Sequence, residues 1–379
     1  MEVWNQLVAA WEAKLAGNTG DAEARFAAAQ DLAQRRGFRY LPAATIATLP
    51  YDDLMKRLQK ALGDKPGKID VMEAEALLGG AAEPPITISR ALELYWPMSK
   101  DKTLSKSRDQ LRRWQNPRKK AIRNLIEVIG DKPMRDITGD DMLAFREWWM
   151  DRLEEEGLTP GSANKDLIHL GEVLKEVNRK KRLGLVLPLS DLSFKQGERK
   201  RRPPFSSDWI KEVLLGARAL DGMNDQARAI TLVMVNTGAR PSEIAALSKN
   251  TIHLEASVPH ISIEPEGRQL KSKRSRRKIP LTGCSLEAIR PFLDGFPRYR
   301  ASSASLSATV NKYLRENNLM QTPEHTMYSL RHAFEDRMLA GGFDERIRRD
   351  LFGHRLNREE YGDGATLDHM HRLLQAIAF

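Results

Sequence analysis

The sequence predicts a mainly α-helical protein with a small β-sheet. Apolar residues recur three and four positions apart in segments throughout the 379 residues, which is the period of amphipathic helices. One stretch, residues 259–282, alternates polar and apolar residues around a charged turn, a pattern typical of two paired strands. A chain of this length with 41% hydrophobic residues can bury two or three separate cores, so more than one domain is expected.

Residues 1–81 form the first expected region, which the pattern predicts to be helical. Its stretches 3–17 and 51–63 have helical apolar spacing. Breakers then interrupt the pattern in "DKPGKID" and "GGAAEPP", which places a boundary near residue 82. The region resembles no known family. Its role stays open, and binding to accessory DNA, to a partner protein or to another protomer are the alternatives.

Residues 82–195 are predicted to form a second, all-helical domain. One helix begins after Thr138, where Asp141 stands three residues later in a capping-box-like arrangement. Trp148 and Trp149 in this helix are predicted to lie in the core. Residues 196–207 follow as a linker, because two prolines and a run of basic residues resist compact structure.

Residues 208–379 are predicted to form a third unit, mainly helical, with the strand pair inside it. Helical spacing is found in 209–220 and 226–238 and resumes after residue 285. The last helix has one apolar face, formed by Leu367, Met370, Leu373, Leu374 and Ile377. This face either completes its own core or docks into a neighbouring protomer.

The net charge of +10 is concentrated in three basic blocks. Lys100–Arg123 has ten basic and two acidic residues, Lys195–Arg202 has five and one, and Arg268–Lys278 has seven and none. Such segregation indicates surfaces that bind a polyanion, although each block alone is also compatible with a solvated helix face.

The remaining composition excludes other classes of protein. The single cysteine, Cys284, excludes an internal disulfide framework and a cysteine-rich metal site. No apolar run approaches the ~18 residues of a membrane span, and the N-terminus lacks the pattern of a signal peptide. A cytoplasmic protein with no membrane partner is expected.

Arg240 is the first candidate functional residue. It stands in "VNTGARPSEIAAL", where a glycine turn ends an apolar run and a new helix begins. The start of a helix favours anions, and a guanidinium can bind two phosphate oxygens at once. The alternative is a structural salt bridge with Glu243, one helical turn further on.

Three further motifs follow in order: a basic hairpin, "YSLRHAFEDRML" and "LFGHRLNREEYGDG". Together with "TGARPSE" they resemble the tyrosine recombinase family, the phage-integrase type of site-specific recombinase, over about residues 82–379. The resemblance implies a helical, SAM-like core-binding domain and an integrase-type catalytic domain that form a C-shaped clamp around duplex DNA. It also implies four protomers in the synaptic complex, accessory DNA-bending proteins, association with the nucleoid, and integration or excision of a mobile element.

The resemblance makes Arg240 and Arg331 the two arginines that clamp the scissile phosphate, and His354 a contact to a non-bridging oxygen. Independently, the phosphate gains negative charge during attack, so cations placed beforehand stabilise the transition state more than the ground state. Two arginines and a histidine can supply this charge without a metal ion or another cofactor.

By the same resemblance, Tyr361 is the nucleophile and Lys271 the acid that protonates the leaving 5′-oxygen. Lys273 is close enough in sequence to remain the alternative acid. Tyr361 stands seven residues after His354, where many relatives have about nine, so a packing role for this tyrosine is the competing interpretation. The covalent phosphotyrosine would conserve the bond energy, and rejoining would need no ATP.

Tyr328 is the main departure from the family pattern, which usually has histidine three residues before the second arginine. We predict that Tyr328 lies on the same helical face as Arg331 and still belongs to the site. A phenol, with a pKa of ~10, is a poor general base near neutrality. A catalytically silent DNA-binding protein and a type IB topoisomerase-like enzyme are the alternative functions.

Overall fold

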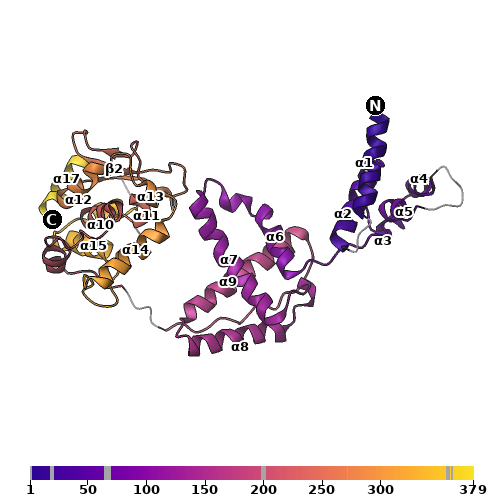
Figure 1. The fold of residues 1–379 in the computed structure, drawn as a ribbon, viewed down its shortest axis with the longest axis horizontal. Helices are drawn as coiled ribbons and strands as arrows, with labels where there is room; N and C mark the ends of the chain where they lie inside the picture. The colour runs from indigo at the N-terminus through magenta and orange to yellow at the C-terminus, as the bar shows by residue number, and fades with distance from the viewer. Residues whose placement is uncertain are drawn as a thin grey trace.

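The computed structural model describes residues 2–17, 21–63, 70–197, 202–270, 272–355, 359 and 362–379. Within them, three separate hydrophobic cores follow one another along the chain. Figure 1 shows the same order in space, with an N-terminal group of helices at one end, a helical bundle in the middle and the sheet-containing domain at the other end. No helix in the described ranges is long and apolar enough to cross a membrane.

The N-terminal domain is helical, and α1 and α4 confirm the two helices expected there. Glu73 is a buried carboxylate of this domain and is 5% exposed. Arg36 and Lys14 neutralise this carboxylate and hold its pKa below the ordinary value, although burial alone would raise it. The helices are α1 (Glu2–Gly17), α2 (Ala22–Arg35), α3 (Ala43–Ile46), α4 (Tyr51–Leu62) and α5 (Val71–Leu78).

The central domain packs its helices around Tyr95, Phe145 and Trp149, all of which are fully buried. Trp148 is only half-buried and lies at the edge of this core. The predicted cap at Thr138 is present, because its hydroxyl accepts from the Asp141 N–H at 3.1 Å and Asp141 accepts from the Thr138 N–H at 2.7 Å. The elements are α6 (Ile88–Met98), η1 (Lys100–Thr103), α7 (Arg108–Ile129), η2 (Met134–Asp136), α8 (Gly139–Glu155) and α9 (Pro160–Lys181).

The C-terminal domain contains the predicted sheet, and in the described residues it has three antiparallel strands in the order β1-β2-β3. The expected pair is β2 with β3, while β1 was not predicted. The segment expected as a helix over 209–220 is instead a short π-helix, η3 (Trp209–Leu214). The strands and 3-10 helices are β1 (Ile252–His253), β2 (His260–Ile263), η4 (Lys273–Ser275), β3 (Arg277–Pro280) and η5 (Arg290–Phe292).

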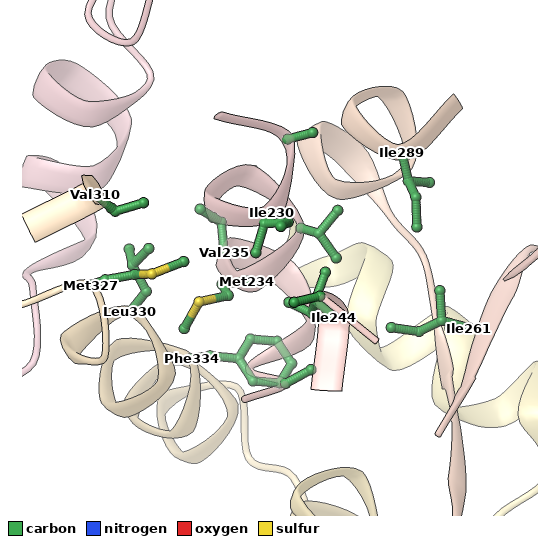
Figure 2. Packing of buried hydrophobic residues seen from close by; sticks show 14 of the residues in the cluster. Ile230, Met234, Val235, Ile244, Ile261, Ile289, Val310, Met327, Leu330 and Phe334 are labelled. Carbon is green, nitrogen blue, oxygen red and sulfur yellow. The ribbon is translucent and has the colours of Figure 1, made fainter. Parts of the chain in front are cut away.

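Helix α10 is the centre of this domain and packs against α12, α14 and α15. Figure 2 shows Met234 and Val235 of α10 among apolar side chains that include Leu330 and Phe334 of α15. The helices are α10 (Asp225–Thr237), α11 (Pro241–Ile244), α12 (Gly283–Ile289), α13 (Pro297–Arg300), α14 (Ser303–Glu316), α15 (Ser329–Ala340), α16 (Glu345–Phe352) and α17 (Leu367–Ala376). Because α10, α11, α15 and α16 end or begin near one another, their termini can bring distant residues together.

Helix α17 packs on its own domain in this single chain. Leu374 is 1% exposed, and Arg337 donates to the Ile377 carbonyl at 2.8 Å. The Phe379 carbonyl accepts from the Cys284 N–H at 2.7 Å, and the Arg337 guanidinium lies over the Phe379 ring at 4.3 Å. In this chain α17 therefore contributes to its own core, while docking into a neighbouring protomer stays a prediction.

The predicted linker is shorter than 196–207 at its C-terminal end. Phe205 is 2% exposed and belongs to the C-terminal core, where its ring lies 4.5 Å from the ring of His325. His325 also forms a 3.0 Å hydrogen bond with the Pro204 carbonyl through Nε2. Burial of an aromatic ring against such a partner stabilises the fold more than exposure of the ring in a linker would.

Candidate active site

Four of the six predicted site residues lie in the described part of the chain. Arg240 directly precedes α11, Tyr328 directly precedes α15, Arg331 lies in the first turn of α15, and His354 follows α16. Lys271 and Tyr361 fall outside the described residues, as does the side chain of Lys273. The described residues include no group of three or more His, Cys, Asp or Glu side chains that could hold a metal ion.

A glycine turn brings Arg240 to the site. Gly238 ends α10 in the left-handed conformation, with φ of 57°. A Cβ at this position would lie 2.4 Å from Cδ1 of Phe334, so both the conformation and the space require glycine. The turn also presents the Gly238 carbonyl to Arg331, which joins the end of α10 to the start of α15.

Arg331 is held in a buried position by three hydrogen bonds. It donates to the Gly238 carbonyl at 2.5 Å and to the Phe352 carbonyl at 3.1 Å, and it lies 3.2 Å from Nε2 of His354. Its guanidinium also lies 4.0 Å from the centre of the Phe352 ring. Burial lowers the pKa of Arg331 to about 10, so the side chain is still a cation at neutral pH.

Glu243 is the anionic centre of a second group of contacts, which we call the Glu243 cluster (Arg240, Glu243 and Arg277). The carboxylate accepts from Arg240 Nη1 at 2.6 Å and from Arg277 Nη2 at 2.8 Å. Burial alone would raise the pKa of Glu243, but Arg277 and Arg240 outweigh burial and lower it to about 2. The predicted salt bridge of Arg240 is therefore present, and it orients the guanidinium instead of leaving it mobile.

Arg277 was missed by the sequence prediction, which treated it as one of seven basic residues in a block. It lies in β3 opposite Ile263, and its side chain is 6% exposed. Its Nε donates to the Leu351 carbonyl at 2.7 Å, so it connects the sheet to α16. Strand alternation could have identified it, because Arg277 lies two residues before buried Ile279 and therefore on the same face of the strand.

His354 is positioned by a second left-handed glycine, Gly353, which ends α16 with φ of 64°. Burial and the positive charges of Arg331 and Arg240 lower the pKa of His354 to about 4. The imidazole is therefore neutral near pH 7. Because Arg331 can only donate, Nε2 accepts this bond, and the hydrogen-bond network assigns the ring proton to Nδ1.

Tyr328 lies beside this group with a half-buried side chain. Its carbonyl accepts from the Arg331 N–H at 3.1 Å. The ring centre lies 5.6 Å from that of His332 and 5.6 Å from the Arg202 guanidinium. The tyrosine is therefore joined to Arg331 through its backbone, while a role of its hydroxyl in the site stays a prediction.

For the DNA-cleaving activity that the sequence motifs imply, we expect Tyr328→Phe to slow cleavage by about 10-fold or more, because it removes a hydroxyl that could donate to the scissile phosphate. DNA affinity should not change, since the ring and its packing remain. Tyr328→His restores the usual group and should retain activity. Single-turnover cleavage and equilibrium binding of all three proteins check this expectation, and a parental rate for the Phe variant would contradict it.

The first basic block divides into structural and exposed residues. Arg118 is 5% exposed and pairs with Glu172 at 2.5 Å, so it holds α7 to α9 and is not part of a DNA-facing surface. By contrast, Lys119, Lys120, Arg123 and others line an open cavity of about 720 Å³ between the same helices. This cavity has the charge that a polyanion-binding surface requires.

Comparison with known proteins agrees with these motifs. Residues 217–359 match the sequence model of the phage integrase family. The tyrosine recombinase XerC of Neisseria meningitidis serogroup C is 24% identical over 181 residues, which are 44% of this chain and 56% of that protein. The chain thus matches about half the length of its curated relatives.

Two solved structures resemble the fold at low sequence identity. A lambda integrase tetramer bound to a Holliday junction gives a TM-score of 0.53 with 15% identity, over 79% of this chain and 85% of that chain. A lambda integrase dimer bound to a core site gives a TM-score of 0.51 with 15% identity, over 74% of this chain and 99% of that chain. Residues 217–359 are thus similar to the phage integrase family, and the chain shares its fold with these two integrase structures.

Proposed function

We propose that the protein is a site-specific tyrosine recombinase that cleaves and rejoins DNA to integrate or excise a mobile element. One observation carries the proposal: Arg240, Arg331 and His354, which are far apart in sequence, converge at the ends of α10, α15 and α16. The converging groups are two permanent cations and a neutral imidazole. This combination suits a phosphodiester that gains negative charge in its transition state.

The two arginines would bind the non-bridging oxygens of the scissile phosphate. Arg331 is fixed by backbone carbonyls and Arg240 by Glu243, so little reorganisation is needed when substrate binds. His354 is neutral before binding. A phosphate beside it would favour its charged form, so the histidine could donate to an oxygen and share a proton with the reacting groups.

The covalent step is a transesterification in which no net bond is lost. The Tyr361 hydroxyl would give its proton to His354 or to water and attack phosphorus, forming a 3′-phosphotyrosyl bond, while the bond from phosphorus to the 5′-oxygen breaks. Lys271, or Lys273 in its place, would give a proton to the leaving 5′-oxygen. Attack by a 5′-hydroxyl on the phosphotyrosine reverses these transfers, so rejoining needs no external energy source.

The DNA would lie between the central and C-terminal domains, with the exposed basic residues of α7 along its backbone. We further propose that four protomers assemble on two attachment sites, with accessory proteins that bend the DNA. With such a double-stranded DNA substrate, the protein would act in the cytoplasm, at the nucleoid.

A nicked duplex that carries the attachment site tests the function directly. After cleavage the short fragment diffuses away, so the covalent intermediate should accumulate and survive denaturing electrophoresis. The adduct should be released by protease and should map to a 3′-phosphate. Binding to the site without any adduct would instead identify a catalytically silent DNA-binding protein.

A further inference from the structure

A second contact joins the central and C-terminal domains, far from the linker in sequence. The side-chain amide of Gln110, in the first turn of α7, pairs with the backbone of Gln269, which lies 159 residues later between β2 and η4. Gln110 Nε2 donates to the Gln269 carbonyl at 2.7 Å, and Gln110 Oε1 accepts from the Gln269 N–H at 3.0 Å. Lys106 donates to the Gln269 side chain, and Arg113 donates to Ser303 Oγ at 2.5 Å.

The amide of Gln110 is oriented by the start of α7. Its Oε1 also accepts from the Ser107 N–H at 3.1 Å, and its own N–H donates to Ser107 Oγ at 3.3 Å. Because Oε1 faces two N–H groups, the NH₂ group must face the Gln269 carbonyl. The contact therefore needs a side chain that both accepts and donates.

The same segment also reaches the candidate active site. Arg268, next to Gln269, donates to the carbonyl of Ser242. Ser242 is the second residue of α11, the helix that Arg240 caps. Burial lowers the pKa of Arg268, while the nearby Glu243 opposes this shift. A small cavity of about 270 Å³ at this junction is lined by residues of both domains, including Arg113, Ser242 and Arg268.

We propose that Gln110 is a positioning residue, which fixes the Arg268–Gln269 segment against α11 when the two domains close on DNA. The inference rests on the proposed recombinase activity. Among the described residues, the hydrogen bonds across this junction all involve a side chain, and the two domains would stay connected through the linker if these bonds broke. Closing the clamp would restore the pairing and with it the position of the Arg268–Gln269 segment against Ser242 of α11. Cleavage would then be confined to the closed state.

The decisive variant is Gln110→Glu. A carboxylate can still accept from Ser107 and from the Gln269 N–H, so the helix cap is preserved, but it cannot donate to the Gln269 carbonyl. Ser107→Ala is the matched control, because it removes one capping bond and leaves the amide in place. At saturating protein, Gln110→Glu should form the adduct about 10-fold more slowly or worse, whereas Ser107→Ala should react at the parental rate. Binding of the intact duplex should stay within about 2-fold for both variants, because neither change removes a basic group.

Three results would overturn the inference. The first is adduct formation by Gln110→Glu at the parental rate. The second is an equal loss of rate in Ser107→Ala, which would assign the effect to the start of α7 and not to the pairing with Gln269. The third is a lower melting temperature of Gln110→Glu that accounts for its slower adduct formation. If the parental chain itself formed no adduct, the proposed function would fail as well, so the two failures are distinguishable.

Discussion

Tyr361→Phe is expected to abolish the covalent protein–DNA adduct while DNA binding remains intact. The change removes only the phenolic oxygen, which is the proposed nucleophile, and keeps the ring. The following residue, Gly362, accepts a 2.6 Å hydrogen bond from Arg346, so the chain on that side of Tyr361 is attached to α16. Loss of the hydroxyl therefore should not release the segment.

The measurement is denaturing electrophoresis of the protein after reaction with the nicked duplex. Tyr51→Phe is a suitable control, since Tyr51 is 73% exposed in the N-terminal domain and its variant should form the adduct normally. A mobility shift of the intact duplex reports binding by both variants. An adduct that persists in Tyr361→Phe would show that another residue is the nucleophile.

Glu243→Gln should have the second large effect, on both stability and cleavage. The side chain of Glu243 is 3% exposed and is shared by two arginines, so its neutralisation leaves Arg240 and Arg277 as uncompensated neighbours. Removing one partner from a buried ion pair destabilises a protein by roughly 3–5 kcal/mol. We expect a loss of this order in urea unfolding, and slower cleavage because Arg240 is no longer oriented.

Glu264→Gln provides the matched control for this prediction. Glu264 pairs with Arg276 at 2.6 Å, but the Arg276 side chain is 69% exposed. A pair of this type contributes about 1 kcal/mol or less. Equal destabilisation by the two substitutions would contradict the importance of the buried cluster.

The pH dependence of unfolding gives an independent check on Glu243. Its folded pKa of about 2 lies below the ordinary value of 4.5, so its stabilising contribution is present above pH 4.5 and is lost as the pH falls toward 2. The difference in unfolding free energy between the parental protein and Glu243→Gln should therefore shrink over this interval. A difference that stays constant would indicate a pKa near the ordinary value.

Much of the fold could be predicted because its signals are local. The Thr138 cap needs two residues three positions apart, and the strand pair β2–β3 needs only alternation. By contrast, β1 has two residues, too few to display a period, and the π-helix η3 has an apolar pattern that does not distinguish it from an α-helix. Phe205 was assigned to the linker because its partner, His325, is distant in sequence.

The residues of the candidate site could be predicted only where a sequence motif marked them. Arg240, Arg331 and His354 stand in recognisable motifs, and the structure brings them together. Arg277 is indistinguishable by composition from its basic neighbours, and the pairing of Gln110 with Gln269 depends on how two domains meet. Such contacts depend on tertiary packing, which local periodicity does not encode.

The Glu243 cluster also bears on ionic strength. Mobile ions screen exposed charges at physiological salt but act weakly on a carboxylate enclosed by the protein. The proposed contacts to DNA phosphates are of the opposite kind, since they form by release of condensed counterions and weaken steeply as salt is added. Concentrated salt should therefore detach the protein from DNA while its arginines remain held in place, and dilution would return an intact site to the duplex.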